Sequence, residues 1–303
     1  MQLLDSLVSA RSWFMSVCRG RHARLAFRAM ALMMLAPDAA RAADPWADQV
    51  VSYSAGTSAD PNYTAAPGVT LGSPERFSGE NTPFGPFPGV VSMFSPAWGV
   101  DEIISIGEGG HLTVKFNEPV NDDPANPFGI DLLVFGNSFF AADFSSFPDA
   151  SHLSSATLFD ADAALIEVST DGINFFSVAP LADRLFPTQG YLDSLAFDAV
   201  PGLLPTNFTR PVNPALTLAD FDGLTRAQAV GLYGGSGGGT GIDLAAVGLS
   251  SIQYVRISVP DDGNSLTRRK AEIDAFATVP EPGTLLLAAA AMMASSRRRI
   301  RTN

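Results

Sequence analysis

Acidic and amide side chains beside glycine- and asparagine-rich turns are the groups in this sequence best suited to chemistry. A hard cation such as Ca²⁺ takes about six to eight oxygen ligands, which carboxylates, amides and free backbone carbonyls can supply. The sequence therefore predicts a Ca²⁺ site. The alternative is that these acids only face water or pair with arginine. The candidate ligands are Asp131, Asn137, Asp243, Glu272 and Asp274.

Residues for catalysis are sparse. After residue 43 the histidines are His111 and His152, and neither stands in an H-E-x-x-H or C-x-x-C metal motif. Ser–His–Asp chemistry needs no fixed spacing, so the sequence leaves it open. Adjacent acids such as Asp122 and Asp123 would serve glycoside hydrolysis only if two carboxyl groups faced each other about 5–10 Å apart. We predict that the protein is not an enzyme.

Aromatic rings are the groups on which a sugar ligand would stack. The candidate is Trp98, in the segment FSPAWGVDE, which follows a proline-rich loop and precedes a predicted strand. The alternative for Trp98 is burial in the core. The other rings available are Trp46, Tyr191 and Tyr233.

Short strands must position these groups. Residues 111–120 alternate in hydropathy, which places Leu112, Val114 and Phe116 on one face of a half-buried strand. Residues 130–137 are apolar on both faces, which is typical of a central strand.

A hairpin is predicted over residues 164–179, with Asp171 and Gly172 as its turn. Alternation returns in residues 252–259, and residues 271–279 form a closing strand with Glu272 and Asp274 on one face.

The rest of the body reads as turns and loops. The chain has 27 glycines and 22 prolines, and its predicted strands do not alternate with helices. An all-β sandwich is therefore predicted. Thr225 is the expected N-cap of one short helix that stops at Gly234. Residues 183–216 form a long proline-rich loop expected over one end of the sheets. We predict a single domain over residues 44–278.

The N-terminal 43 residues are typical of a secretory signal peptide. Arginines precede an apolar run from Leu25 to Leu35, and small residues follow around Ala42. The lead-in is long, so translation could begin at Met15, and the alternative is an amphipathic helix of the fold. Removal of this leader would remove Cys18, the single cysteine, and leave a body without disulfides.

The predicted body is strongly acidic. Residues 44–280 contain 28 Asp or Glu against 9 Lys or Arg, although the whole chain has a net charge of −12. Such a body repels phosphate backbones, so nucleic acid is not an expected partner. Divalent cations and cationic polymers suit it better, and simple solubility is the alternative.

The C-terminal segment 279–303 combines a Pro-Glu-Pro turn, an apolar run and a basic cluster. The run from Gly283 to Ser296 would span about 21 Å as a helix, short of the roughly 30 Å hydrocarbon core. The arginines are expected to stay on the cytoplasmic side. The turn comprises Val279, Pro280, Glu281 and Pro282, and the basic stop comprises Arg297, Arg298, Arg299 and Arg301.

This ending resembles the PEP-CTERM sorting signal of Gram-negative bacteria, on the residues VPEPGTLLL. The resemblance implies that the tail holds an exported protein in the inner membrane until an exosortase processes it at the Pro-Glu-Pro motif. It also implies a place among exopolysaccharide-associated proteins, at the cell surface or in the extracellular matrix. A simple tail anchor is the alternative.

The body resembles the exported domain of many PEP-CTERM and other bacterial surface proteins, on the segments IDLLVFGN, IEVSTDGINF, GGSGGGTGIDLAAVGL, YVRISV and AEIDAFA. That resemblance implies a jelly-roll-like β-sandwich akin to carbohydrate-binding modules, often with a structural Ca²⁺, and assigns no catalytic residues. We therefore expect a structural or adhesive protein of the surface or the exopolysaccharide matrix. The alternative is a carbohydrate-binding module with a defined glycan ligand.

Overall fold

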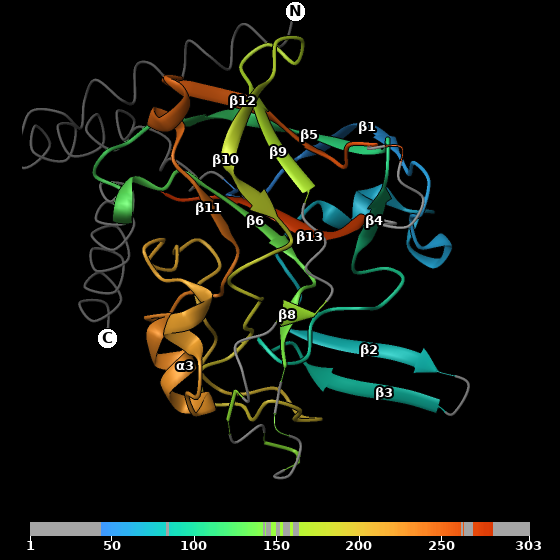
Figure 1. Cartoon of the computed structure of the whole chain (residues 1–303), viewed down its shortest axis with the longest axis vertical. Coiled ribbons are helices and arrows are strands. Elements are labelled where there is room, and N and C mark those ends of the chain that lie inside the picture. The colour runs from blue at the N-terminus through green and yellow to red at the C-terminus, as the bar shows by residue number, and fades with distance from the viewer. Residues whose placement is uncertain are drawn as a thin grey trace, which may run out of the picture. The chain divides into compact units, whose positions relative to one another are not determined.

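The computed structural model describes most of the predicted body: residues 44–82, 85–141, 143, 147–149, 152–153, 158–159, 164–261, 263 and 269–280. Its strands form two main sheets, which Figure 1 shows with the larger one above the smaller one. The predicted signal peptide and the predicted apolar helix of the tail lie outside the described residues.

The larger sheet has five strands in the order β1-β5-β12-β9-β10, and all neighbouring strands are antiparallel. Strands from the start, the middle and the end of the chain are therefore neighbours. The bounds are β1 Gln49–Ser54, β5 His111–Asn121, β12 Ser251–Ser258, β9 Ala164–Ser169 and β10 Phe176–Ala182.

The smaller sheet has four strands in the order β11-β6-β13-β4 and is also antiparallel. β6 pairs on both sides and is almost entirely buried, so the prediction of a central strand there is confirmed. The bounds are β11 Thr240–Ile242, β6 Leu132–Gly136, β13 Lys270–Thr278 and β4 Ile104–Gly107.

One hydrophobic cluster joins the two sheets. Leu112, Val114 and Phe116 of β5 are buried in it together with Val134 of β6 and Ile273 of β13, so the predicted alternation of the first strand is confirmed. Such a shared core is where most of the apolar surface leaves water, at about 25 cal/mol per Å². The described part of the chain is therefore mostly β with two open sheets, and the jelly-roll-like sandwich stays a prediction.

The predicted hairpin is present, with a longer turn than expected. β9 and β10 pair with Phe176 opposite Val168, so six residues separate the two strands. The carboxylate of Asp171 organises this turn by accepting the backbone N–H groups of Ile173 and Asn174, each at 2.8 Å. These hydrogen bonds hold the pKa of Asp171 well below its usual range.

Strand β13 contains an irregularity. Its pairing with β6 shifts in register between Ile273 and Ala275. Ile273 and Phe276 both belong to the core between the sheets, whereas Ala275 packs in a separate cluster with Phe208. A β-bulge of this kind reverses which residues face the core, and here it does so at Asp274.

The one α-helix among the described residues is α3, Arg226–Leu232. Thr225 caps it in a capping box with Gln228, as the sequence predicts. The helix buries Ala229 and Val230 in a second hydrophobic cluster with Phe221 and Tyr233, away from the core between the sheets. Figure 1 shows α3 and the hairpin of β2 and β3 on the side of the smaller sheet away from the larger one.

The remaining elements are short. Two small antiparallel pairs are β2 Phe77–Thr82 with β3 Gly85–Val90, and β7 Phe139–Phe140 with β8 Leu158–Phe159. The 3₁₀ turns are η1 Pro61–Tyr63, η2 Pro67–Thr70, η3 Pro127–Gly129, η5 Leu218–Phe221 and η6 Leu244–Val247.

The two ends of the described body lie side by side. Ala47 donates its N–H to the carbonyl of Phe276 at 3.3 Å, and Thr278 donates to the carbonyl of Pro45 at 2.7 Å. The segment that follows the predicted signal peptide thus pairs with the end of β13.

Candidate functional site

An open groove of about 420 Å³ lies on the five-stranded sheet, on the face away from the core. Alternation along β5 places Leu112 and Val114 in the core, so His111 and Thr113 point the other way. We call this feature the polar groove. Its lining includes His111, Thr113, Glu167, Phe175, Arg256 and Ser258.

Arg256 and Glu167 form the best-defined contact in the polar groove. They are register partners on β12 and β9, and Arg256 donates Nε–H and Nη2–H to the two carboxylate oxygens at 2.8 and 2.7 Å. Ser258 donates its hydroxyl to the same carboxylate at 2.9 Å. The Phe175 ring lies over the guanidinium, 3.9 Å from Cζ to the ring centroid. Such a bidentate, stacked pair fixes both side chains in one geometry.

The pair remains ionised near neutral pH. Hydrogen bonds from Arg256 hold the pKa of Glu167 below its usual value, and the positive charge of His111 adds to this effect when that ring is protonated. Hydrogen bonds to Glu167 in turn raise the pKa of Arg256. A carboxylate held in this way is a hydrogen-bond acceptor and a poor proton donor.

The polar groove offers an aromatic face, charged hydrogen-bond donors and acceptors, and the hydroxyl groups of Ser52, Thr113 and Ser258. These are the groups that fix a hydroxyl-rich ligand in an open site. Sequence reasoning missed this site. The alternation predicted for residues 252–259 implies that Arg256 and Ser258 share a face, but it could not show that Glu167 is their neighbour.

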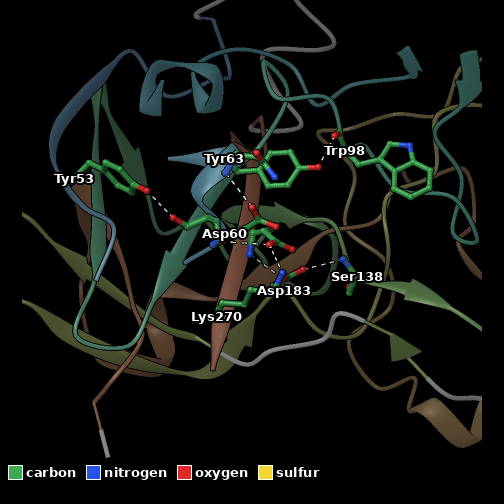
Figure 2. Close-up of polar contacts among 10 residues, drawn as sticks. Tyr53, Asp60, Tyr63, Trp98, Ser138, Asp183 and Lys270 are labelled. Atoms are coloured by element: carbon green, nitrogen blue, oxygen red, sulfur yellow. Dashed lines mark hydrogen bonds and ion pairs between the residues drawn. The ribbon is translucent and has the colours of Figure 1, made fainter. Parts of the chain in front are cut away.

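The predicted sugar-stacking residue Trp98 lies elsewhere. Its side chain is 46% exposed, so burial in the core, the alternative, is wrong. Two hydrogen bonds hold its backbone, one from its N–H to Glu102 Oε2 at 3.2 Å and one from the Tyr63 hydroxyl to its carbonyl at 2.9 Å. Figure 2 shows the indole ring pointing away from these polar groups. Trp98 therefore presents a single ring on a loop and does not line the polar groove.

The five predicted calcium ligands are distributed over three places and do not form one site. Asp131 and Asp243 lie together with Asp122. Asn137 and Glu272 lie beside Asp183, as the hydrogen bonds of the Asp183 carboxylate show. Asp274 lies beside Glu75.

The Asp183 group is a buried structural network (Figure 2). The Asp183 carboxylate accepts N–H groups from Ser138 and Glu272, both at 2.9 Å, and burial raises its pKa well above the usual value. Glu272 in turn accepts Lys270 Nζ at 2.6 Å and the Ser105 hydroxyl at 3.4 Å. Both carboxylates are hydrogen-bonded, although Asn137 Oδ1 is buried without a hydrogen-bond partner. The network therefore links β13, β4 and the loop at Asp183.

The Asp274 group gathers like charges. Burial raises the pKa of Asp274 well above its usual value, and the charges of Glu75 and Glu102 add to that rise. The pKa of Glu75 is raised for the same reasons, with burial first. Glu102 is held by hydrogen bonds from the Ser78 hydroxyl at 2.6 Å and the Gly99 N–H at 2.8 Å. Like charges in a buried cluster favour protonated carboxyl groups.

The Asp131 group lies where the ends of both sheets meet. Asp122 follows β5, Asp131 precedes β6, and Asp243 follows β11. One carboxylate oxygen from each lies within 4.8 Å of the other two. Burial raises the pKa of Asp131, and the charge of Asp122 adds to the rise. This arrangement could hold a cation.

The glycine-rich segment 234–241 includes GGSGG, which fits the nucleophile pattern G-x-S-x-G. Ser236 is fully buried, donates its hydroxyl to the carbonyl of Arg210 and accepts the Gly238 N–H at 3.1 Å. The segment also follows a helix, whereas a nucleophile elbow follows a strand. Ser236 thus acts as a packing and hydrogen-bonding residue of this turn.

The described chain ends at the start of the predicted sorting tail. Val279 is only 7% exposed, packs in a cluster with Trp46 and donates its N–H to the carbonyl of Asp131 at 2.9 Å. Residues 278–300 match the family model of the PEP-CTERM protein-sorting motif. The chain carries a PEP-CTERM sorting motif.

That motif indicates a protein that is exported and sorted to the cell envelope or surface, with an exosortase as its processing enzyme. Pro280 is described, while the other predicted motif residues, Glu281 and Pro282, and the basic stop lie outside the described residues. No curated protein matches the chain. Among the helices of the described residues, none is long and apolar enough to cross a bilayer.

Proposed function

We propose that this PEP-CTERM protein is a non-enzymatic structural or adhesive component of the cell surface or of an exopolysaccharide matrix. The observation that carries the proposal is the position of the sorting motif, which begins at the last residue of β13 and so joins a folded, acidic body directly to its tail. The arginines of the tail are costly to move across a bilayer, so the tail end stays inside while the body is exported.

The experiment is an intact-mass measurement on protein extracted from the cell surface of the producing organism. We expect a species that lacks everything after the Pro-Glu-Pro region. Replacement of Pro280, Glu281 and Pro282 by alanine should trap a larger form in the inner membrane. Replacement of Ser295 and Ser296 by alanine, in the same tail, is the matched control and should leave processing intact. A surface species that still ends in RRRIRTN would mean that the tail is a plain anchor.

Carbohydrate binding is the second candidate, and the polar groove is the observation that favours it. Its stacked Arg256 and Phe175 and its hydroxyl groups suit a glycan, and the exposed Trp98 offers a separate ring. The test is binding of the full chain to a glycan array. Loss of binding in His111→Ala would place the ligand in the groove, and loss in Trp98→Ala would place it on the loop.

The matched control for this test is Ser177→Ala, an exposed position of the same sheet that does not line the groove. Each variant needs an unchanged thermal melting temperature before its binding is compared. No binding across a broad array would favour the structural or adhesive role alone.

A further inference from the structure

Three carboxylates from three strand ends converge beside a buried amide. Asp122, Asp131 and Asp243 bring one oxygen each within 4.8 Å of the others. Two oxygens on opposite sides of Ca²⁺, each bound at about 2.3–2.6 Å, lie about 4.6–5.2 Å apart, and about 4.2 Å is the limit for Mg²⁺. All the separations in this cluster are at most 4.8 Å, so they lie within the span that one Ca²⁺ ion bridges.

The cluster is built from the interior outward. Asp131 is fully buried, and its carboxylate accepts the N–H groups of Asp123 and Leu244, each at 3.0 Å. Asp122 and Asp243 are only partly buried, so they face the solvent side of Asp131. Among the described residues, no lysine or arginine forms an ion pair with any of the three. A buried carboxylate beside two others, without a cationic partner, is unfavourable unless a cation or a proton is shared.

A second, independent observation comes from Asn126. Its side chain is 4% exposed and is aimed into the cluster, where Nδ2 lies 3.0 Å from Asp131 Oδ1. Its Oδ1 is buried and has no hydrogen-bond partner. A buried amide oxygen without a partner costs about 1–3 kcal/mol. With the two ends of the carboxamide exchanged, Oδ1 would face the cluster and bind a cation, and Nδ2 would give up its hydrogen bond to Asp131.

We infer that Asp122, Asp131 and Asp243, with the carboxamide oxygen of Asn126, bind one Ca²⁺ ion. The ion links the loop after β5, in the larger sheet, to the loops beside β6 and β11, in the smaller sheet. It therefore joins the two sheets at one end of the body. The carbonyl of Asp131 also accepts the N–H of Val279, so one ligand of the site is hydrogen-bonded to a residue of the matched sorting motif.

The competing acid groups are less suitable. Glu272 already pairs with Lys270, and among the described residues the acids beside Asp183 do not bring three ligand atoms within 4.8 Å of one another. The acids around Asp274 do not bring three ligand atoms as close together in the described residues. Two of the five ligands predicted from sequence, Asp131 and Asp243, thus belong to the inferred site, and the other three do not.

The test uses the full chain in detergent micelles, stripped of metal with a chelator and then titrated with CaCl₂ by calorimetry. Extracellular calcium modules bind with a Kd of about 10⁻⁴–10⁻³ M. We expect one ion per chain. At a free concentration of about 100 times the Kd, the melting temperature should rise by about 5–10 °C. NaCl and MgCl₂ at matched ionic strength should give a clearly smaller rise.

Variants locate the ion. Asp122→Asn and Asp243→Asn keep the size of the side chain, and Asn can still cap the turn at residue 243, where Asp243 accepts the Ala245 N–H. Each should weaken Ca²⁺ binding at least tenfold. Glu118→Gln, an exposed acid on β5, is the matched control and should bind as the wild type does.

Three results would overturn the inference. The first is no calorimetric binding and no thermal shift at 10 mM CaCl₂. The second is equal stabilisation by Mg²⁺, which would indicate charge screening of an acidic protein. The third is binding that survives Asp122→Asn and Asp243→Asn but is lost in Asp274→Asn, which would place the ion at the other acid group.

Discussion

Replacement of Glu167 by glutamine tests whether the polar groove is held by its ion pair. Hydrogen bonds to charged groups contribute about 1.5–3 kcal/mol. The Arg256 side chain is 31% exposed and that of Glu167 15%, so solvent weakens the pair. Glutamine also keeps one acceptor for the guanidinium. We therefore expect a loss of about 1–2 kcal/mol in the free energy of unfolding near neutral pH. For a body of this size the melting temperature falls by about 2–8 °C.

The pH dependence has a definite sign. Because Arg256 depresses the pKa of folded Glu167 below the ordinary value of 4.5, the pair stabilises the fold above that pH. The contribution is lost as the pH falls through the depressed pKa and the carboxylate takes up a proton. The difference in melting temperature between the wild type and Glu167→Gln should therefore shrink as the pH is lowered from 7 towards 3.

The assay is a thermal melt of the full chain from pH 3 to pH 7, with a double-mutant cycle of Glu167→Gln and Arg256→Gln at pH 7. We expect a coupling energy of about 1 kcal/mol between the two positions. Glu118→Gln, an exposed acid on the adjacent strand β5, is the matched control and should change little. A coupling energy of zero, or a difference in melting temperature that does not change with pH, would refute the reasoning.

Two further predictions concern the core and the acid groups. Phe276 is buried in the middle of β13, so Phe276→Ala should lower the free energy of unfolding by about 3–5 kcal/mol. Phe128 is 56% exposed, so Phe128→Ala should lower it far less. Equal losses for the two variants in chemical denaturation would contradict the core assignment. Glu75→Gln should lower the raised pKa of Asp274. A carboxyl group whose pKa is raised in the folded state makes the protein less stable as the pH rises above the ordinary value of 3.8. In the presence of chelator, Glu75→Gln should therefore lose less stability than the wild type between pH 4 and pH 7. Equal pH dependence of stability in the two proteins would contradict this prediction.

The sequence predicts the local elements of this protein well, because their causes are local. Alternation placed Leu112, Val114 and Phe116 in the core, and Thr225 caps α3 through a box that spans three residues. The turn at Asp171 was predicted, but it is longer than the predicted two residues. The sequence pattern does not show how many backbone N–H groups hydrogen-bond to the Asp171 carboxylate.

The arrangement of the acids could not be predicted, because it depends on contacts between distant residues. Asp274 meets Glu75 across 199 positions, and Leu244 donates to Asp131 across 113. The bulge in β13 changes which residues face the core at Asp274, and no local pattern marks it. The sequence analysis treated as one site five residues that the structure places in three separate groups.

The position of β13 at the end of the body has a consequence for how the protein is made. Among the described strands, β13 is the last to leave the ribosome and the export channel, yet it lies between β4 and β6 and joins them. Until it arrives, β4 has no partner in its sheet, and the segment at Pro45 has no strand end to pair with. The smaller sheet can therefore close only after residue 278, where the matched sorting motif begins, has been exported. Completion of the fold and emergence of the sorting motif are therefore coupled, because the strand that closes the sheet directly precedes the motif.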